Sequence, residues 1–433
     1  MPRCGAPFHR EKAMSNSEQL VEHFFRHEYA NLVAVLTRAF GVARIDLIED
    51  MVGSAMLQAM HVWKQKGVPE NPAGWIHRVA RNRILDCLRR DKAHEKAMAF
   101  SGLQSSSSET EQLLDSWLDE KELPDGLLRM MFVCCHPSLD RSSQIALSLK
   151  ILCGFSLSEI ARGLLLSTEA VKKKVQRAKK KLAEEKIAVE IPPPDQLHER
   201  LSAVHEVLYL MFNEGYSTSH GSDPIRDDVC EEAARLCHLL CENEQLSNSE
   251  SKALLALMLF HAARLEARVD SLGNPVLLGD QDRSKWDRKL IAVADQWLVR
   301  SVENQPSRFH FEAVIAQMHC AAESVEETDW RQIAVFYERL QERYPSPVYQ
   351  LNHSIALAQD GRVDEALRQI EQIRDGGELK DYYLLDCTIG YIQTLAGNTS
   401  AAIDAYLDAL QGPIAPHQKT LIEKRLREIS PST

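Results

Sequence analysis

The segment from Phe155 to Leu182 constrains the fold most strongly, because it reads as two short helices joined by a tight connection. Ser156, followed three residues later by Glu159, forms a capping box that opens the first helix, and Ser167 is a natural N-cap for the second. Apolar residues recur at helical spacing through the second helix, so its other side chains must face outward. This pattern predicts a helix-turn-helix, the geometry that places a recognition helix in a DNA major groove.

The outward face of that second helix is strongly basic. Seven lysine and arginine residues lie between positions 172 and 181, in a chain of net charge −11. A charge run is usually a solvated helix face, but a dense basic run in an acidic chain favours a nucleic-acid partner. We expect the DNA contacts at Ser167, Lys172, Lys173, Lys174, Gln176 and Arg177, with phosphates held by Lys179, Lys180 and Lys181.

A second basic surface is predicted closer to the N-terminus. Asn71 and Pro72 form an N-cap and first-turn pair that opens a helix extending to about Lys92. Trp75 lies on the apolar stripe of this helix, where we expect it to pack in the core and not to stack on a base. Arginine suits phosphate contacts and asparagine suits base edges. The polar face presents Arg78, Arg81, Asn82, Arg89 and Arg90.

Helical periodicity extends along nearly all of the chain and predicts an all-α protein. We expect a flexible N-terminus at 1–16, a helical module at 17–95, an acidic, serine-rich linker at 96–122, the helix-turn-helix module at 123–187, a proline-rich linker at 188–196 and a larger helical domain at 197–433. Near 330–411, Ser354 and Ala366 are repeated 36 residues later by Gly390 and Ala402. This spacing resembles tetratricopeptide repeats, although two unrelated helix hairpins with glycine turns would also give it.

Composition and motif spacing exclude several classes of protein. No stretch is apolar enough for a membrane span, and the first residues lack the apolar core of a signal peptide, so we expect a cytoplasmic protein without a membrane partner. Cys134, Cys135 and His136 are adjacent but have no second CxxC pair. We therefore expect no metal and no cofactor.

A polar set in the C-terminal domain raises the alternative of catalysis. No nucleophile–base spacing, glycine-rich phosphate loop or HExxH pattern accompanies it, so we expect no enzyme and no catalytic residue. We interpret the set as buried caps and ion pairs, with a site for a small ligand or a protein as the alternative, and a hydrolase with an accessory DNA module as a further one. Its members are Asn213, Glu214, Tyr216, His261, Arg264, Arg268, Asp280, Asp282 and Arg283.

The order of these motifs resembles a bacterial extracytoplasmic-function sigma factor of the sigma-70 family over roughly residues 20–187. The matching parts are an acidic helix (DLIEDMVGSAM, 46–56), the stretch WIHRVARNRILDCLRR (75–90), a linker and the basic helix-turn-helix. The resemblance implies promoter DNA and RNA polymerase core as partners, with the arginine-rich helix on the minus-ten element and the helix-turn-helix on the upstream element. It implies contacts to the beta-prime clamp and beta flap, with core-binding residues at Asp46, Glu49, Asp50 and Met56.

The C-terminal half resembles one subgroup of these factors. The segments LYLMFNEGYSTSHG (208–221), LMLFHAARLEARVD (257–270) and LLGDQDRSKWD (277–287) look like the long sigma factors with a tetratricopeptide-like C-terminal extension, which implies regulation in cis by that extension. Two departures stand out: Gly53 and Ser54 replace the usual glutamine and glutamate, and Lys174 replaces a frequent arginine. The alternative function is a helical-repeat sensor or scaffold whose helix-turn-helix regulates DNA without polymerase.

Overall fold

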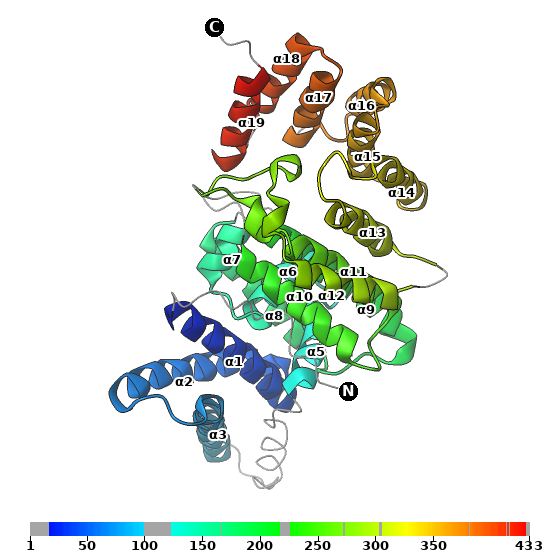
Figure 1. Cartoon of the computed structure of the whole chain (residues 1–433). Helices are drawn as coiled ribbons and strands as arrows, with labels where there is room; N and C mark the ends of the chain where they lie inside the picture. Colours follow the sequence, from blue (N-terminus) through cyan, green and yellow to red (C-terminus); the bar gives the residue numbers. More distant parts are fainter. Residues whose placement is uncertain are drawn as a thin grey trace. The chain divides into compact units, whose positions relative to one another are not determined.

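The structure, a computed structural model, describes residues 17–98, 123–164, 166–216, 226–271, 273–302, 305–380, 382–412, 414 and 416–429. Within these ranges the chain is helical, and its extended pairing is one isolated bridge between Val269 and Pro275. The expected all-α fold is confirmed. The N-terminus expected to be flexible (1–16) and most of the expected linker (96–122) fall outside the described residues. The chain divides into two compact units between Met211 and Phe212, and each is described separately (Figure 1).

The first unit begins with α1 (Ser17–Phe40), the short η1 (Val42–Arg44), α2 (Ile45–Lys66) and α3 (Pro72–Met98). Helix α1 is buried on all sides over residues 32–36, because α2 and α3 pack on it together with α5. The backbone N–H of Gly74 donates to Asn71 Oδ1 at 2.7 Å, which confirms the expected N-cap of α3. Trp75 is partly buried and packs against Trp63, with ring centroids 5.7 Å apart.

The helix-turn-helix follows in the same unit, after α5 (Leu123–Cys134) and α6 (Arg141–Ile151). The expected capping box is present: Ser156 opens α7 (Leu157–Gly163) and exchanges hydrogen bonds with Glu159. Ser167 opens α8 (Thr168–Glu184) by accepting a hydrogen bond from the N–H of Ala170 at 3.1 Å. The apolar stripe of α8 is buried, so its polar face is oriented as the spacing predicts.

Helix α9 (Pro194–Tyr216) begins at the last of the three consecutive prolines. Proline fits this first-turn position because the N–H it lacks has no partner within a helix. The N-terminal half of α9 packs on the helix-turn-helix module. Arg200 donates to the carbonyl of Phe132 at 2.6 Å, and Arg141 donates to the carbonyl of Ala203 at 3.2 Å.

The second unit is centred on α11, whose residues 253–260 are all buried. Such a helix is apolar on every side and needs neighbours all around it, here α10, α12 and α13. The helices of this part are α10 (Asp227–Glu242), α11 (Ser249–Ala262), α12 (Arg288–Arg300) and α13 (Arg308–Ala321), with short turns η2 (Leu265–Arg268), η3 (Leu278–Asp280) and η4 (Arg283–Lys285).

Helix hairpins complete the second unit. Its last helices are α14 (Trp330–Arg343), α15 (Pro347–Gln359), α16 (Val363–Gly376), α17 (Tyr383–Leu395), α18 (Thr399–Ala409) and α19 (Pro416–Ile429). Gly361 and Gly397 turn the two hairpins with φ of +82° and +77°, a conformation that favours glycine. A Cβ on Gly390 would lie 2.9 Å from the ring of Tyr406, so the small residue permits the close approach of α17 and α18. Tetratricopeptide-like repeats and unrelated hairpins both predict helix hairpins here, and the hairpins are present.

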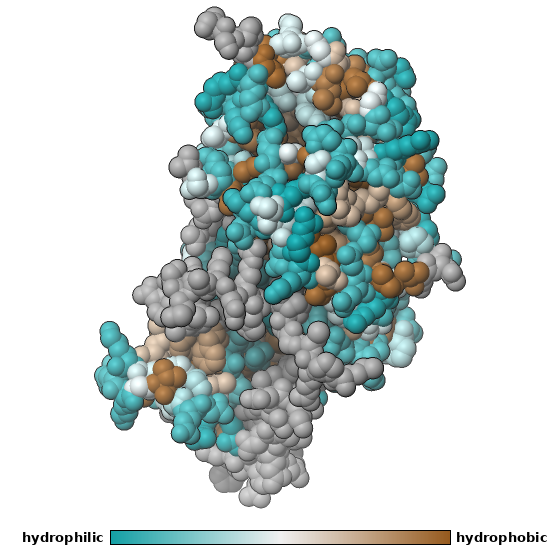
Figure 2. Space-filling model, viewed as in Figure 1, coloured by the Kyte–Doolittle hydropathy of each residue, from teal (hydrophilic) through white to brown (hydrophobic). Residues whose placement is uncertain are grey.

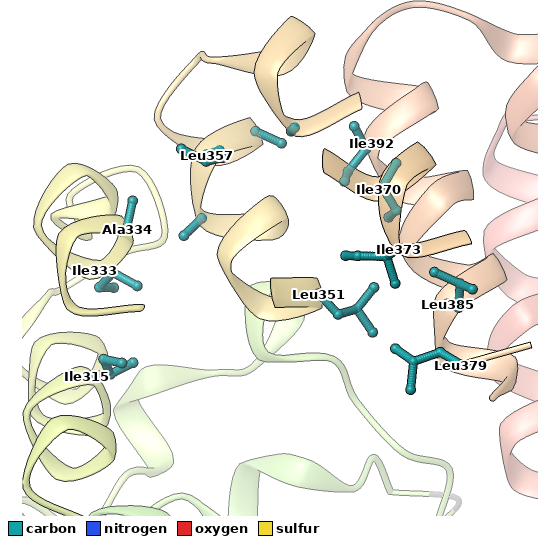
Figure 3. Packing of buried hydrophobic residues seen from close by; sticks show 13 residues of the cluster. Ile315, Ile333, Ala334, Leu351, Leu357, Ile370, Ile373, Leu379, Leu385 and Ile392 are labelled. Atoms are coloured by element: carbon teal, nitrogen blue, oxygen red, sulfur yellow. The ribbon is translucent and has the colours of Figure 1, made fainter. Parts of the chain in front are cut away.

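The hairpins share an apolar core that runs from α13 to α17. Leu351 of α15, Ile370 and Ile373 of α16 and Leu385 of α17 are buried together (Figure 3). The helices pack mainly on their neighbours along the chain, and α15 also contacts α17.

Candidate nucleic-acid interface

Helix α8 presents most of its basic residues to solvent. Lys172, Lys173, Gln176 and Arg177 are exposed, and so is the N-cap Ser167. Lys174 is partly exposed and lies 3.8 Å from a carboxylate oxygen of Asp140, the N-cap of α6. Ser143 hydrogen bonds and the nearby Lys174 lower the pKa of Asp140, so this carboxylate is ionised. The helix thus offers guanidinium, ammonium and amide donors along one face, as major-groove reading requires.

Lys179 lies on the opposite side of α8 and is only 8% exposed. Its Nζ donates to Asp46 Oδ1 at 2.8 Å and also to Glu49 Oε2. Burial disfavours the ammonium charge, but Glu49 and the two hydrogen bonds outweigh burial and raise the pKa of Lys179. The ammonium group of Lys179 therefore makes its hydrogen bonds within the protein. Lys180 and Lys181, the other residues expected to hold phosphates, are exposed.

Glu49 of α2 is the centre of this buried network. It accepts a hydrogen bond from Tyr29 Oη at 2.5 Å and lies 3.8 Å from Lys150 Nζ. Burial and the carboxylate of Glu49 raise the pKa of Tyr29, so the phenol keeps its proton. Burial lowers the pKa of Lys150, against the opposing effect of Glu49. The network joins α1 and α2 to α6 and α8 within one unit.

A second ion pair links the same two modules. Arg26 of α1 donates to Glu159 Oε1 at 2.5 Å, and its guanidinium carbon lies 4.6 Å from the ring centroid of Phe155. Glu159 is the capping-box residue, so one carboxylate serves both the start of α7 and the contact with α1. The roles of Arg26 and Lys150 were not predicted from the sequence. Their partners lie 133 and 101 positions away, and no local pattern signals such pairs.

The outer face of α2 carries exposed apolar residues that sequence analysis also missed. Leu57 is 70% exposed and Met60 is 56% exposed, one helical turn apart. Asp50 is exposed on the same helix, whereas Met56 is buried in the core of the unit. Among the residues expected to bind core, Asp46 and Asp50 are exposed, but Asp46 and Glu49 both accept hydrogen bonds from Lys179, and Met56 faces inward. Exposed apolar side chains that gather on one face can mark a protein-binding surface.

The two departures from the family pattern, Gly53 and Ser54, have clear surroundings. Ser54 Oγ accepts a hydrogen bond from Arg83, which also donates to Gln58 Oε1 at 2.7 Å. A Cβ on Gly53 would meet no other atom within 4 Å. Ser54 therefore fastens α2 to α3, and Gly53 leaves open space on the helix surface.

Helix α3 presents the second expected nucleic-acid surface. Arg78 and Asn82 are exposed on the side away from the buried Ile76 and Ile84, whereas Arg81 is partly exposed at the edge of the buried face, with its Nε buried. The side chains of Arg89 and Arg90 lie outside the described ones. The end of α2 and the loop before α3 are exposed over most of residues 64–71.

The polar set of the C-terminal unit is only partly brought together. Tyr216, His261, Arg264 and Arg268 converge, whereas Asp282 caps η4 and Asp280 pairs with Arg425 at 2.8 Å. The interpretation of the set as caps and ion pairs holds for these two aspartates. It also holds for Arg283, which donates to the last carbonyls of α13 and so caps that helix. It is wrong for Arg264, whose hydrogen-bond acceptors are a phenol and a histidine nitrogen. In the described part of the chain no three histidine, cysteine or acidic residues are grouped to hold a metal ion.

The visible surface is mostly hydrophilic, with separate apolar patches (Figure 2). None of the helices in the described ranges is long and apolar enough to cross a membrane.

Comparisons with known proteins agree with this geometry. The family model "Sigma-70 region 2" matches residues 24–94, which hold α2 and most of α3, and "Sigma-70, region 4" matches residues 129–182, which hold nearly all of the helix-turn-helix. Residues 200–302 match a family of unknown function, DUF6596. An uncharacterized protein of Rhizobium meliloti is 34% identical over 397 residues, which cover 88% of this chain and 93% of that relative. No solved structure matches the chain.

Proposed function

We propose that this chain, which belongs to the sigma-70 family and carries a C-terminal extension, is an extracytoplasmic-function sigma factor that directs RNA polymerase core to promoters. One observation carries the proposal: α3 and α8 bury their apolar stripes in one unit and turn separate basic faces outward. A factor that holds duplex DNA at one site and opens it at another needs two such faces. Since core polymerase and promoters are its proposed partners, its proposed place of action is the cytoplasm.

In the proposed role α8 reads the upstream promoter element in the major groove. Lys172, Lys173 and Arg177 supply donors for base edges, and Lys180 and Lys181 contact phosphates. Lys179 takes no part in DNA binding, because it is buried against Asp46 and Glu49. Affinity for promoter DNA should fall steeply with salt, since phosphate contacts release counterions.

Helix α3 and the loop before it are proposed to open the minus-ten element. An unstacked base costs a few kcal/mol and must be captured by pocket contacts. Asn82 offers an exposed amide for a base edge, and Arg78 and Arg81 offer guanidinium groups for the backbone. Permanganate footprinting tests this assignment: Asn82→Ala should lower the reactivity of promoter thymines, whereas Gln411→Ala, an exposed amide in the other unit, should not. Equal reactivity of Asn82→Ala and wild type would exclude this role for Asn82.

The outer face of α2 is proposed to dock on the polymerase clamp through Asp50, Leu57 and Met60. These three side chains are proposed because they are exposed on one helix, whereas Glu49 is already bound by Lys179. Gel filtration with core polymerase tests the proposal. Leu57→Ser/Met60→Ser should abolish co-elution with core, and Val302→Ser, which changes an 81% exposed valine in the other unit, should leave it intact. Co-elution of the double variant would refute this docking face.

Regulation in cis by the C-terminal extension is a further part of the proposal. It is supported by α9, which leaves the helix-turn-helix module through contacts of Arg200 and Arg141 and continues into the extension. Truncation after Tyr216 keeps those contacts and removes the rest. Increased transcription would indicate that the extension represses the factor, and lost transcription that it is required. Unchanged transcription with unchanged promoter choice would refute regulation in cis.

A further inference from the structure

The C-terminal unit contains a cluster of cations that lacks a carboxylate. Arg264 follows α11 and is only 5% exposed, and Arg268 lies in η2. Arg264 donates to Tyr216 Oη at 2.5 Å and lies 3.3 Å from Nδ1 of His261. The guanidinium carbon of Arg268 lies 3.7 Å from the ring centroid of Tyr216. Two guanidinium groups thus converge on one phenol.

Hydrogen bonding in this cluster is incomplete. Within the described ranges the Nε atoms of Arg264 and Arg268 are buried without a hydrogen-bond partner, and no carboxylate forms an ion pair with either residue. Burial lowers the pKa of Arg264, and the groups that outweigh burial are the phenols of Tyr216 and Tyr337 and the thiol of Cys320. A buried cation without a compensating charge is strongly unfavourable.

The neighbouring Arg283 differs, because hydrogen bonds to backbone carbonyls stabilise its charge. It donates to the carbonyls of His319 and Ala322 at 2.9 and 2.7 Å, at the C-terminal end of α13. A cation at that position is favourable, since the last carbonyls of a helix lack partners and carry partial negative charge. Arg283 therefore needs no further partner, and the unexplained charge belongs to Arg264 and Arg268.

The local potential is strongly positive. Burial would raise the pKa of Tyr216, but Arg264 and Arg268 outweigh burial and lower it. Burial and the same two arginines lower the pKa of His261 well below its usual value, so this imidazole is neutral at physiological pH. The titratable groups that face the cluster thus favour negative charge and oppose positive charge.

We propose that Arg264, Arg268 and Tyr216 form a binding site for a small molecule that carries a carboxylate or phosphate group. Guanidinium groups bind both oxyanions through paired, charge-assisted hydrogen bonds. Phe212 stacks on Tyr216 at 5.8 Å, and Trp286 lies 5.7 Å from the guanidinium carbon of Arg264, so aromatic rings flank the cations. The oxyanion supplies the missing countercharge, and the rings of Phe212 and Trp286 exclude water from the site. The site goes beyond the proposed promoter function and does not depend on it.

Calorimetric titration of the full chain with inorganic phosphate and with acetate tests the proposal, with chloride at equal ionic strength as the baseline. Binding of phosphate alone would identify a phosphate site, and binding of acetate alone a carboxylate site. Arg268→Gln should weaken the affinity for the bound anion about tenfold or more, because it removes a charged donor. Arg300→Gln is the matched control, since Arg300 also lies over an aromatic ring, that of Trp297 at 5.0 Å, but is exposed.

Tyr216→Phe separates the proposal from its main rival, in which an ionised Tyr216 is itself the countercharge. The variant keeps the ring, and the site predicts that anion binding persists. The rival predicts tyrosinate absorbance at neutral pH in the wild type, loss of that absorbance in Tyr216→Phe and no anion binding. That result would overturn the proposal, and so would an affinity that Arg268→Gln leaves unchanged.

Discussion

The two units each bury cations, but they neutralise them differently. In the first unit Lys179 is held by two carboxylates, those of Asp46 and Glu49. In the second, Arg264 and Arg268 converge on the phenol of Tyr216, and no carboxylate pairs with either arginine in the described part of the chain. The first centre is complete without any other molecule, because its charges balance within the chain. The second is left with uncompensated charge, and this difference separates a structural contact from a candidate binding site.

The largest effect is expected from a substitution that breaks the contact of Lys179 with Asp46 and Glu49. Lys179→Met leaves Glu49 buried beside Tyr29, with only Lys150 nearby, and should lower the opening free energy of α8 by about 3 kcal/mol. Native-state hydrogen exchange of the amides of residues 171–182 measures this local opening.

The double variant Lys179→Met/Glu49→Leu should recover most of that loss, because a buried ion pair and a well-packed apolar pair are often equally stable. Lys180→Met is the matched control: Lys180 pairs with Glu184 at 3.7 Å in solvent, and its loss should cost less than about 1 kcal/mol. A double variant as unstable as the single one would show that Lys179 stabilises the unit by something other than its charge.

The next largest effect is expected on the stability of the second unit when His319, close to Arg264 and Arg283, is protonated. Burial and the nearby Arg264 and Arg283 lower the pKa of His319 to about 3. Because this folded-state pKa lies below the unfolded value, the contribution of neutral His319 is complete above about pH 6.5 and is lost as pH falls. Between pH 7 and pH 5 this residue should cost the second unit about 2 kcal/mol of stability.

His319→Phe keeps an aromatic ring beside Trp330, which lies 5.2 Å away, and removes the titrating group. Urea unfolding at pH 7 and pH 5, in chloride, should show a smaller loss for this variant than for the wild type. Identical losses would mean that the arginines do not act on His319, and would weaken the contrast between the two centres.

The smallest expected effect tests whether the outer face of α2 is free of packing contacts. Gly53→Ala should raise stability by about 0.5–1 kcal/mol, since alanine is the better helix former and its Cβ meets no other atom. Thermal unfolding measures this gain. A loss of stability would show that the outer face of α2 is packed against other residues.

Local sequence signals predicted the elements of both units well. Ser156 and Ser167 cap their helices, Asn71 opens α3, and Gly361 and Gly397 turn the hairpins, because each depends on neighbours a few residues away. Long-range charge pairing was not predictable in the same way. Lys179 belongs to a basic run, and only its register on the apolar side of α8 separates it from Lys180 and Lys181.

The candidate site in the second unit shows the same limit of local reasoning. Arg264 and Arg268 were grouped with Asp280 and Asp282 and interpreted as caps and ion pairs, because no catalytic motif accompanies them in the sequence. In the structure Asp282 caps η4 and Asp280 pairs with Arg425. Arg264 and Arg268 therefore have no carboxylate partner in the described part of the chain. Which opposite charges meet depends on tertiary packing.

Run-off transcription tests the central claim, that regions 2 and 4 of this chain direct polymerase core to a promoter. The template is the upstream region of the gene for this chain, incubated with core alone, with the chain alone and with both. We predict one defined transcript only when both are present, and its loss in Lys172→Ala/Lys173→Ala/Arg177→Ala, a variant that still co-elutes with core. A chain that shifts this DNA by itself but yields no transcript with core would contradict the account and favour a DNA-binding regulator that acts without polymerase.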